Sequence, residues 1–187
     1  MSHDIAADAT VGYAYDVDAG SASIGEDATV REGTIIYADV DIGRNFATGH
    51  NVLVREDVEI GDDVVVGTNT VVDGNATIGS NVSLQTGVYV PPHTTIGDHV
   101  FVGPHAVLTN DPHPVRKTVE LEGPTVEDHV SIGANATLLP GVTVGKHSFV
   151  AAGAIVTRDV PPETLAVGVP AEHEPLAEPL LGGNRLP

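Results

Sequence analysis

The most regular feature of the chain is an aliphatic residue at every sixth position. Over residues 24–108 each sixth position holds Ile, Val or Leu except Thr48, and the count resumes in register over residues 126–156. The residue two places before each of these positions is usually small or β-branched, as at Ala28 and Thr34. Residues two apart in a strand point to the same face. Each hexad therefore predicts a short strand with two inward side chains, followed by a polar corner.

A second period of 18 residues lies over the first. The dipeptide Ile-Gly begins at Ile24, Ile42, Ile60, Ile78, Ile96 and Ile132. The first five of these pairs are 18 residues apart, and the sixth lies two such periods after the fifth. Three hexads therefore make one turn, which indicates a three-sided parallel β-helix whose coils stack about 4.8 Å apart. A Gly beside the inward residue allows a tight corner, and we expect the narrow interior to exclude aromatic rings.

The ends of the chain lack this regularity. Val11-Gly12 and Val17-Asp18 resemble hexads one residue out of register with Ile24, so we expect residues 1–23 to form a distorted first coil that caps the stack. Val160, Pro161 and Pro162 end the regular part, and residues 165–171 read as a short extended piece. We assign residues 1–171 to one β-helix domain and residues 172–187 to a tail that is loose or packs along a face.

One segment inside the repeat breaks the pattern. Residues 109–125 contain Pro112, Pro114 and Pro124, which forbid regular pairing, yet the aliphatic count is kept across them. A long loop in a compact repeat is usually functional, although a tolerated surface insertion is the alternative. The polar residues at its start favour a functional loop.

Charge narrows the classes of partner. The chain has 26 acids, 8 bases and a net charge of −18, which argues against nucleic acid because phosphates need a basic surface. The acids are spread over corner positions, as at Asp62 and Asp98, which favours a surface adapted to a high-salt cytoplasm over one for a cationic partner. Cys is absent, no apolar run is long enough for a membrane span, and residues 1–8 lack the features of a signal peptide. We expect a cytoplasmic protein without a disulfide framework.

The hexads, the loop and the C-terminal run of the repeat resemble a known family. The hexads, the loop and the run ANATLLPGVTVGKHSFVAAGAIVTRDVPPETLAVGVPA are similar to the hexapeptide-repeat acyltransferases, over residues 24–171. The resemblance implies a left-handed β-helix, acetyl-CoA as co-substrate, and a homotrimer with the cofactor between subunits. Outward apolar residues such as Tyr89, Phe101 and Phe149 could serve that interface or belong to ordinary surface.

The start of the loop is similar to N-acetyltransferases that act on nucleotide-linked amino sugars, of the UDP-2-acetamido-3-amino-glucuronate type. Their pattern is matched by Gly103-Pro104, Thr109-Asn110 and Pro114. The resemblance implies that Asn110 contacts the sugar amine and the reacting carbonyl. A neutral amine is already nucleophilic, so positioning can suffice.

The same stretch also resembles sugar O-acetyltransferases of the galactoside and maltose kind. Their catalytic His follows a Pro by nine residues and precedes another, as His113 does with Pro104 and Pro114. A hydroxyl needs a base, and a His with an ordinary pKa near 6.5 suits that role. Asp111 or Glu122 would orient the ring. Transfer to an amine and transfer to a hydroxyl both remain open.

Cofactor contacts are implied towards the C-terminal end. Arg158 stands where the family places a basic residue near the CoA phosphates. The family often has Lys or Arg where this chain has Glu172. The remaining residues expected to border the cofactor are small or cyclic: Ala134, Ala151, Ala152 and Pro170.

The histidines do not predict a metal site. Five of them fall three residues after an aliphatic position and are therefore outward corner residues: His93, His99, His105, His129 and His147. The γ-class carbonic anhydrases share the hexads, but their His pair five residues apart has no counterpart. We expect no metal, although a zinc site built across subunits, or a non-catalytic solenoid, would be compatible with the repeat alone.

Overall fold

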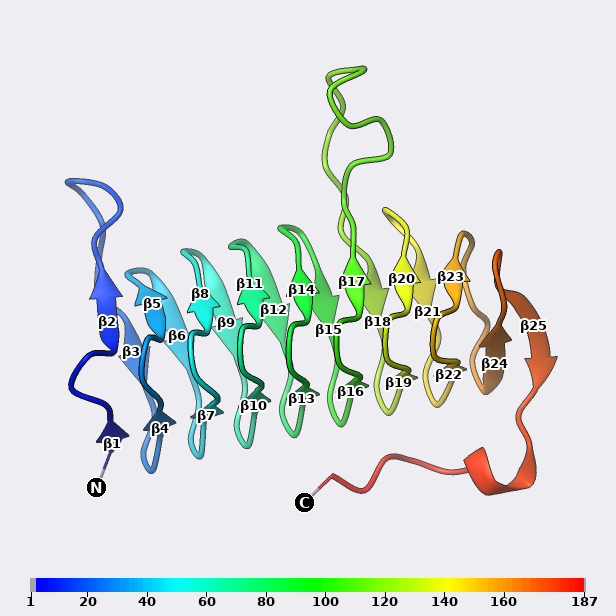
Figure 1. Cartoon of the computed structure of the whole chain (residues 1–187), viewed down its shortest axis with the longest axis horizontal. Helices are drawn as coiled ribbons and strands as arrows, with labels where there is room; N and C mark the ends of the chain where they lie inside the picture. The colour runs from blue at the N-terminus through cyan, green and yellow to red at the C-terminus, as the bar shows by residue number, and fades with distance from the viewer. Residues whose placement is uncertain (1–2, 187) are drawn as a thin grey trace.

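The computed structural model describes residues 3–186 and forms a three-sided parallel β-helix (Figure 1). Each coil contributes one short strand to each of three sheets. Sheet A contains β1 (Asp4–Ile5), β4 (Thr29–Val30), β7 (Ala47–Thr48), β10 (Val65–Val66), β13 (Ser83–Leu84), β16 (Phe101–Val102), β19 (Ser131–Ile132), β22 (Phe149–Val150), β24 (Thr164–Val167) and β25 (Glu172–Pro175). Sheet B contains β2 (Thr10–Tyr13), β5 (Ile35–Tyr37), β8 (Leu53–Val54), β11 (Val71–Val72), β14 (Tyr89–Val90), β17 (Val107–Leu108), β20 (Thr137–Leu138) and β23 (Ile155–Val156). Sheet C contains β3 (Ser23–Ile24), β6 (Val40–Ile42), β9 (Val58–Ile60), β12 (Ala76–Ile78), β15 (Thr95–Ile96), β18 (Thr125–Val126) and β21 (Thr143–Val144).

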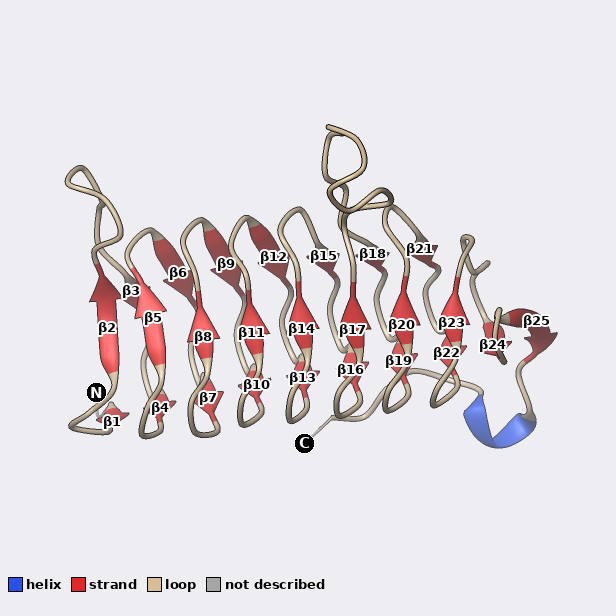
Figure 2. Cartoon of the chain, turned by 45° about the horizontal axis from the view of Figure 1, so that its top comes forward, coloured by secondary structure: helices blue, strands red, loops and turns tan. Residues whose placement is uncertain are grey.

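The path of the chain is a left-handed coil. In Figure 2 the strands of sheet B rise on the near side, and the chain returns behind them through sheet C while it advances towards the C-terminal end. The sheet order confirms the three-sided β-helix expected from the repeat, and the hand of the coil is the one that the resemblance implied. Among residues 3–186 there is no helix with the length and hydrophobicity that a bilayer span requires.

The interior is filled by the two inward positions of each hexad. The aliphatic residue of every regular hexad is buried from Val30 to Val156, and so is the small residue two places before it in most hexads. The polar exception Thr48 is buried too, and its Oγ1 accepts a hydrogen bond of 2.9 Å from the backbone N of Arg31. The expectation that rings are excluded is wrong at Phe46, which is fully buried. Its neighbour in the hexad is Thr48 rather than a larger aliphatic residue, which leaves room for the ring.

The corners share one backbone conformation. The third residue after the aliphatic position has a positive φ in every regular corner, for instance 59° at Asn69 and 57° at His99. The exceptions are Asp111 in the loop and Asp159 near the C-terminal end. This left-handed region is most accessible to Gly, Asn and Asp, and His is also enriched there. The corner residues of the regular coils are of these types: Asp27, Gly33, Asp39, Asn45, Asn51, Asp57, Asp63, Asn69, Asn75, Asn81, Gly87, His93, His99, His105, His129, Asn135, Gly141, His147 and Gly153. The corner positions expected for five histidines are confirmed.

The excursion between β17 and β18 changes which sheet the later repeats join. Thr77 pairs with Thr95 at a spacing of 18 residues, whereas Thr95 pairs with Thr125 at a spacing of 30, so the insertion is 30 − 18 = 12 residues. Twelve residues equal two hexads, so the aliphatic residues after the insertion still fall at every sixth position. Each of them lies on a different sheet from the one that the 18-residue count would give. The first five Ile-Gly pairs therefore lie at the ends of strands of sheet C, whereas the sixth lies at the end of a strand of sheet A, where Ile132 pairs with Val102.

The N-terminal coil is distorted as expected. Val11 pairs with Ile36, but the register shifts before Tyr13. Val17 is not part of a hexad, because it is 97% exposed in the loop 14–22 that projects at the N-terminal end in Figure 1. This loop is held by Asp39, which accepts a hydrogen bond of 2.8 Å from Tyr15 Oη; that bond is the main cause that raises the pKa of Tyr15 to about 12.

The C-terminal end reverses direction. The extended piece expected near residues 165–171 is β24, and β25 pairs with it antiparallel. A short 3₁₀ helix, η1 (Glu178–Leu180), follows, and the tail then runs back along sheet A. The tail therefore packs along a face, one of the two arrangements considered for it.

Candidate active site

The loop of residues 109–124 projects from the corners between sheets B and C (Figure 1). Its base is tied to the next coil by Thr109, whose N and Oγ1 donate to Leu138 O at 3.0 and 2.9 Å. Its two limbs are joined by a bond of 3.0 Å from Glu122 N to Asn110 O, and Gly141 N donates to Glu122 O at 3.0 Å. The base of the loop is therefore fixed to the prism. Thr125 already belongs to β18, one residue earlier than the expected end of the loop.

Asn110 lies at this base with its side chain half-buried. Its Nδ2 donates to Pro92 O at 3.2 Å, across the corner of the preceding coil. The amide group is thereby held in one orientation. The structure gives its Oδ1 no protein donor among the described residues, so this oxygen can accept a hydrogen bond from a ligand.

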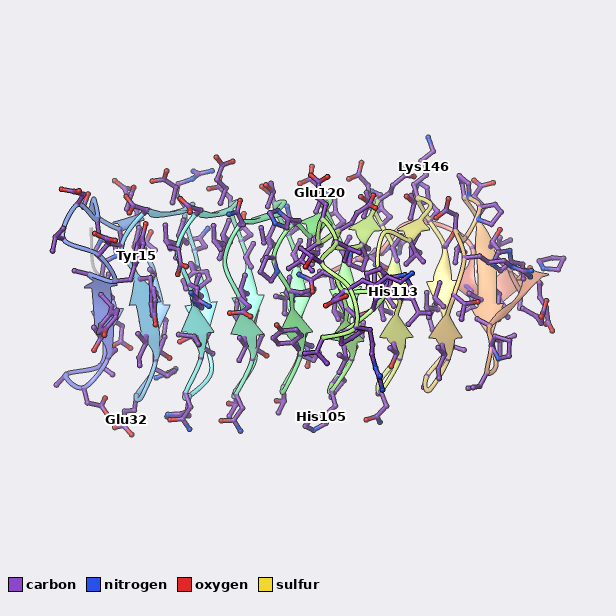
Figure 3. The ribbon with its side chains drawn as sticks, turned by 90° about the horizontal axis from the view of Figure 1, so that it is seen from above. Tyr15, Glu32, His105, His113, Glu120 and Lys146 are labelled. Carbon is purple, nitrogen blue, oxygen red and sulfur yellow. The ribbon has the colours of Figure 1, made fainter. Side chains whose placement is uncertain are left out.

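Asp111 and His113 form a turn further along the loop. Asp111 Oδ1 accepts a hydrogen bond of 2.7 Å from the backbone N of His113, and His113 O accepts one of 2.9 Å from Arg116 N. The carboxylate is therefore directed at the backbone of His113 and not at its ring. The imidazole is exposed, and Figure 3 shows His113, seen from above, between the edge that carries Lys146 and the edge that carries His105.

Ala134, Ala151, Ala152 and Pro170 lie on a different edge, at the corners between sheets A and B. Gly153 N donates to Ala134 O at 2.8 Å, which stacks the two Ala-bearing corners. Close stacking requires the Gly beside Ala134, because a Cβ on Gly133 would lie 2.4 Å from Ala152 N. Pro170 is next to Ala171, whose N donates to Ile155 O at 2.8 Å. The four residues therefore form one narrow strip along successive coils.

Arg158 lies at the corner after β23, on the same side of sheet B as the loop. Its guanidinium forms an ion pair of 2.9 Å with Glu172, and both side chains are more than half exposed. An exposed pair of this kind contributes little to stability. An anionic ligand of Arg158 would therefore have to displace Glu172. This is the position at which the resemblance implied a basic residue.

The residues suggested by the sequence thus lie along both edges of the C-terminal half of sheet B. Asn110, His113 and Arg158 are on one edge and the Ala strip is on the other, with the outward side chains of Val107 and Ile155 between them. A side of about six residues is roughly 15–20 Å wide. A single small acceptor cannot touch both edges, and one chain presents them as an open face.

Two hollows near the loop were not indicated by the sequence. One of about 570 Å³ lies on sheet C, where Thr95, Thr125, Lys146 and Pro162 are among its lining residues. The other, of about 330 Å³, is lined by Glu120, Leu121 and Glu122 on the second limb of the loop. The first hollow lies where Thr95 pairs with Thr125 across the insertion, and the second lies on the inserted residues themselves. Hexad spacing alone does not reveal either place. The described part of the chain brings no three metal-binding side chains together.

Comparison of the sequence with protein-family models identifies the hexapeptide repeats. The family model described as bacterial transferase hexapeptide (six repeats) matches residues 75–110 and 123–158, and the hexapeptide repeat of succinyl-transferase matches residues 40–74 and 57–92. The first match leaves out residues 111–122, the same number of residues as the insertion measured from the strand pairing. A comparison with curated protein sequences found no match.

Solved structures extend the likeness. A hexapeptide-repeat acetyltransferase from Vibrio cholerae, solved in complex with acetyl-CoA, is 31% identical, with a TM-score of 0.53 over 60% of this chain and 67% of that one. A UDP-N-acetylglucosamine acyltransferase from Campylobacter jejuni shares the fold at 20% identity, with a TM-score of 0.70 over 92% of this chain and 72% of that one. A UDP-N-acetylglucosamine acyltransferase from Bacteroides fragilis is 19% identical, with a TM-score of 0.65 over 91% of this chain and 73% of that one.

The coil, the repeat and the projecting loop define a protein of the hexapeptide-repeat class. Within that class the chain belongs to the bacterial hexapeptide transferases, and it is an enzyme of the acyltransferase type.

Proposed function

We propose that the chain transfers the acetyl group of acetyl-CoA to the amine of an amino sugar, and that the sugar is linked to a nucleotide. The observation that carries this proposal is the fixed amide of Asn110, held by Pro92 O at 3.2 Å at the base of a loop whose limbs are tied together. The loop sequence Gly103-Pro104, Thr109-Asn110 and Pro114 supports an amino-sugar acceptor. The acetyl-CoA complex of the Vibrio cholerae relative supports the co-substrate.

The chemistry needs little from the protein beyond positioning. The neutral amine attacks the thioester carbonyl carbon, the C–S bond breaks, and the proton lost by nitrogen leaves with the thiolate of CoA. Asn110 Oδ1 would accept a hydrogen bond from the amine and direct its lone pair at the carbonyl. Backbone N–H groups of the coil edge would stabilise the oxyanion.

The open face of sheet B implies that the site is completed by a second copy of the chain. The loop edge and the Ala strip of one chain are too far apart to enclose one acceptor, whereas a neighbouring copy would supply the missing wall. We therefore include a homotrimer in the proposal, with acetyl-CoA between subunits. Ala134, Ala151, Ala152, Pro170 and Arg158 would border the cofactor.

A hydroxyl acceptor is the second candidate, and one observation favours it. Asp111 fixes the backbone of His113 in a tight turn of the loop, and the ring of His113 is accessible. A base there could take the proton of a hydroxyl. The lack of a described partner for the ring favours the amine, because a base needs a defined orientation.

Release of CoA thiol measures the reaction directly, and the chain contributes no background because it contains no Cys. Acetyl-CoA would be incubated with amino sugars, with the same sugars carrying a nucleotide, and with matched sugars that bear a hydroxyl in place of the amine. We expect thiol release with nucleotide-linked amino sugars. Turnover only of the hydroxyl series would contradict the proposal.

Two substitutions separate the candidates. Asn110→Ala removes the positioning oxygen and is expected to lower kcat/KM about 100-fold. His113→Ala is expected to cost less than about tenfold for an amine, but about 100-fold or more for a hydroxyl. His50→Ala is the control, because His50 is an exposed corner residue distant from the loop. Equal losses in His113→Ala and Asn110→Ala would favour the hydroxyl acceptor.

A further inference from the structure

The C-terminal tail crosses sheet A as a strap, defined here as residues 178–186. In Figure 1 it leaves β25 and runs back below β22, β19 and β16. One side chain pins it. Asn184 Oδ1 accepts a hydrogen bond of 2.8 Å from Ser131 Oγ, and its Nδ2 donates to His99 O and to Val130 O, each at 2.9 Å.

The strap lies on a column of three stacked imidazoles at the corners between sheets C and A. The ring of His129 is 4.6 Å from that of His99 and 4.8 Å from that of His147, with interplanar angles of 1° and 8°. The rings stack because all three residues occupy the same corner position in successive coils. In earlier coils the same column holds Asn45, Asp63 and Asn81, so imidazole is not required by the backbone.

The middle ring is covered by the strap. A Cβ on Gly183 would lie 2.8 Å from His129 Nδ1, so only a residue without a side chain can pass this close. His129 Nδ1 is itself buried and has no hydrogen-bond partner among the described residues. Beside it the strap encloses a hollow of about 270 Å³, and His147, Phe149 and Arg185 are among its lining residues.

We propose that the strap is a pH-dependent latch, closed while the imidazole of His129 is neutral and released when this ring binds a proton. A proton on this ring places a positive charge under the strap, between the rings of His99 and His147. Release lets water reach the ring and moves the strap, which carries Arg185, out of the hollow that it shares with His129. It also uncovers the part of sheet A around Phe149.

The surrounding charges set the direction of the response. Burial, followed by His99 and His147, lowers the pKa of His129 from its ordinary 6.5, while the neighbouring Asp128 and Asp98 act in the opposite sense. Asp128 Oδ1 is occupied by Asp98 N at 2.9 Å. Glu127, on the same corner, accepts a hydrogen bond from Lys146 N at 2.8 Å.

These contacts fix the pH window of the latch. The closed strap binds fewer protons at His129 than the open strap does. Closure is therefore fully stable above about pH 6.5 and loses stability as the pH falls below that value.

A single spin label tests the latch, since the full chain has no Cys to compete for it. The label would be attached in Leu181→Cys, at an exposed position of the strap. We expect an immobile spectrum at about pH 7.5 and a largely mobile one at about pH 5, with a midpoint below about 6.5. Far-UV circular dichroism at each pH would report on the coils.

Three second-site variants complete the experiment. His129→Asn keeps a residue that the same corner accepts at Asn45 and Asn81, and it is expected to lose most of the mobility change. Asn184→Ala is expected to be mobile at every pH. His93→Asn, at a corner not under the strap, should respond like the parent. An unchanged response in His129→Asn, no response in the parent, or loss of the coil signal at the same pH would each overturn the proposal.

Discussion

At the scale of single residues, the backbone conformation of the corners explains which polar residue types occupy them, which hydrophobic patterning does not predict. Every regular corner residue has a positive φ, and the chain fills these places with Gly, Asn, Asp and His. A left-handed conformation costs an ordinary L-residue about 1–2 kcal/mol. The corner histidines are therefore explained by backbone conformation before any chemistry is assigned to them.

Asn69 offers a test of this cost, because it is an exposed corner residue with φ 59°. Asn69→Val should destabilise the protein by about 1–2 kcal/mol relative to Asn69→Gly, since a β-branched residue is strained where Gly is not. The two variants would be compared by thermal unfolding. Equal midpoints would show that the corners tolerate any residue.

At the scale of elements, the loop is a twelve-residue addition to a coil that would otherwise have normal length. The strand pairing on either side differs by that number, and residues 111–122 fall between the two segments that match the repeat. Asn110 and Gly123 then stand at the places where a normal corner would begin and end. The fold should therefore not depend on the inserted residues.

Deletion of residues 111–122 joins Asn110 to Gly123 and restores the spacing of 18 residues between paired strands. We expect the circular dichroism spectrum to persist and the stability to change by less than about 1 kcal/mol, because loop length affects stability weakly. Acetyl transfer should be lost. Deletion of residues 111–121 is the matched control, since one extra residue would turn the following side chains to the wrong face.

Sequence reasoning succeeded where the period carries the information. It predicted the coil, the corner histidines, the position of the loop and the cap at the N-terminal end. It failed where the spacing is ambiguous, because an insertion of two hexads preserves every aliphatic position while moving Ile132 to another sheet. The hydrogen bonds of Asn110 and Asp111, the Arg158–Glu172 pair and the strap depend on contacts between distant segments, which no local pattern encodes.

At the scale of the whole molecule, in-register stacking places like charges next to one another. Asp41 pairs directly with Glu59 on sheet C, and Asp39 and Asp57 occupy the same corner in adjacent coils. Only four ion pairs are found among residues 3–186, against a net charge of −18 for the chain. Repulsion between acids about 4.8 Å apart is therefore a property of the entire surface.

Salt should stabilise such a surface by screening. We expect the thermal midpoint to rise steadily between about 0.05 M and about 2 M KCl, because the Debye length falls below the spacing of the stacked acids. The double variant Asp41→Asn, Glu59→Gln should respond less. A midpoint that does not change with KCl would reject the interpretation of the acids as an adaptation to high salt.

The antiparallel pairing of β25 with β24 has a consequence for how copies of the chain can meet. A parallel ladder offers evenly spaced donors and acceptors, whereas an antiparallel one alternates between narrow and wide pairs. A second copy that approached end to end would meet β25, which is the last strand of sheet A and runs antiparallel to β24. The first strand of that copy would therefore not find the parallel ladder that the other coils offer. Head-to-tail growth into fibres is thereby blocked at this end, and association is directed to the sides of the prism.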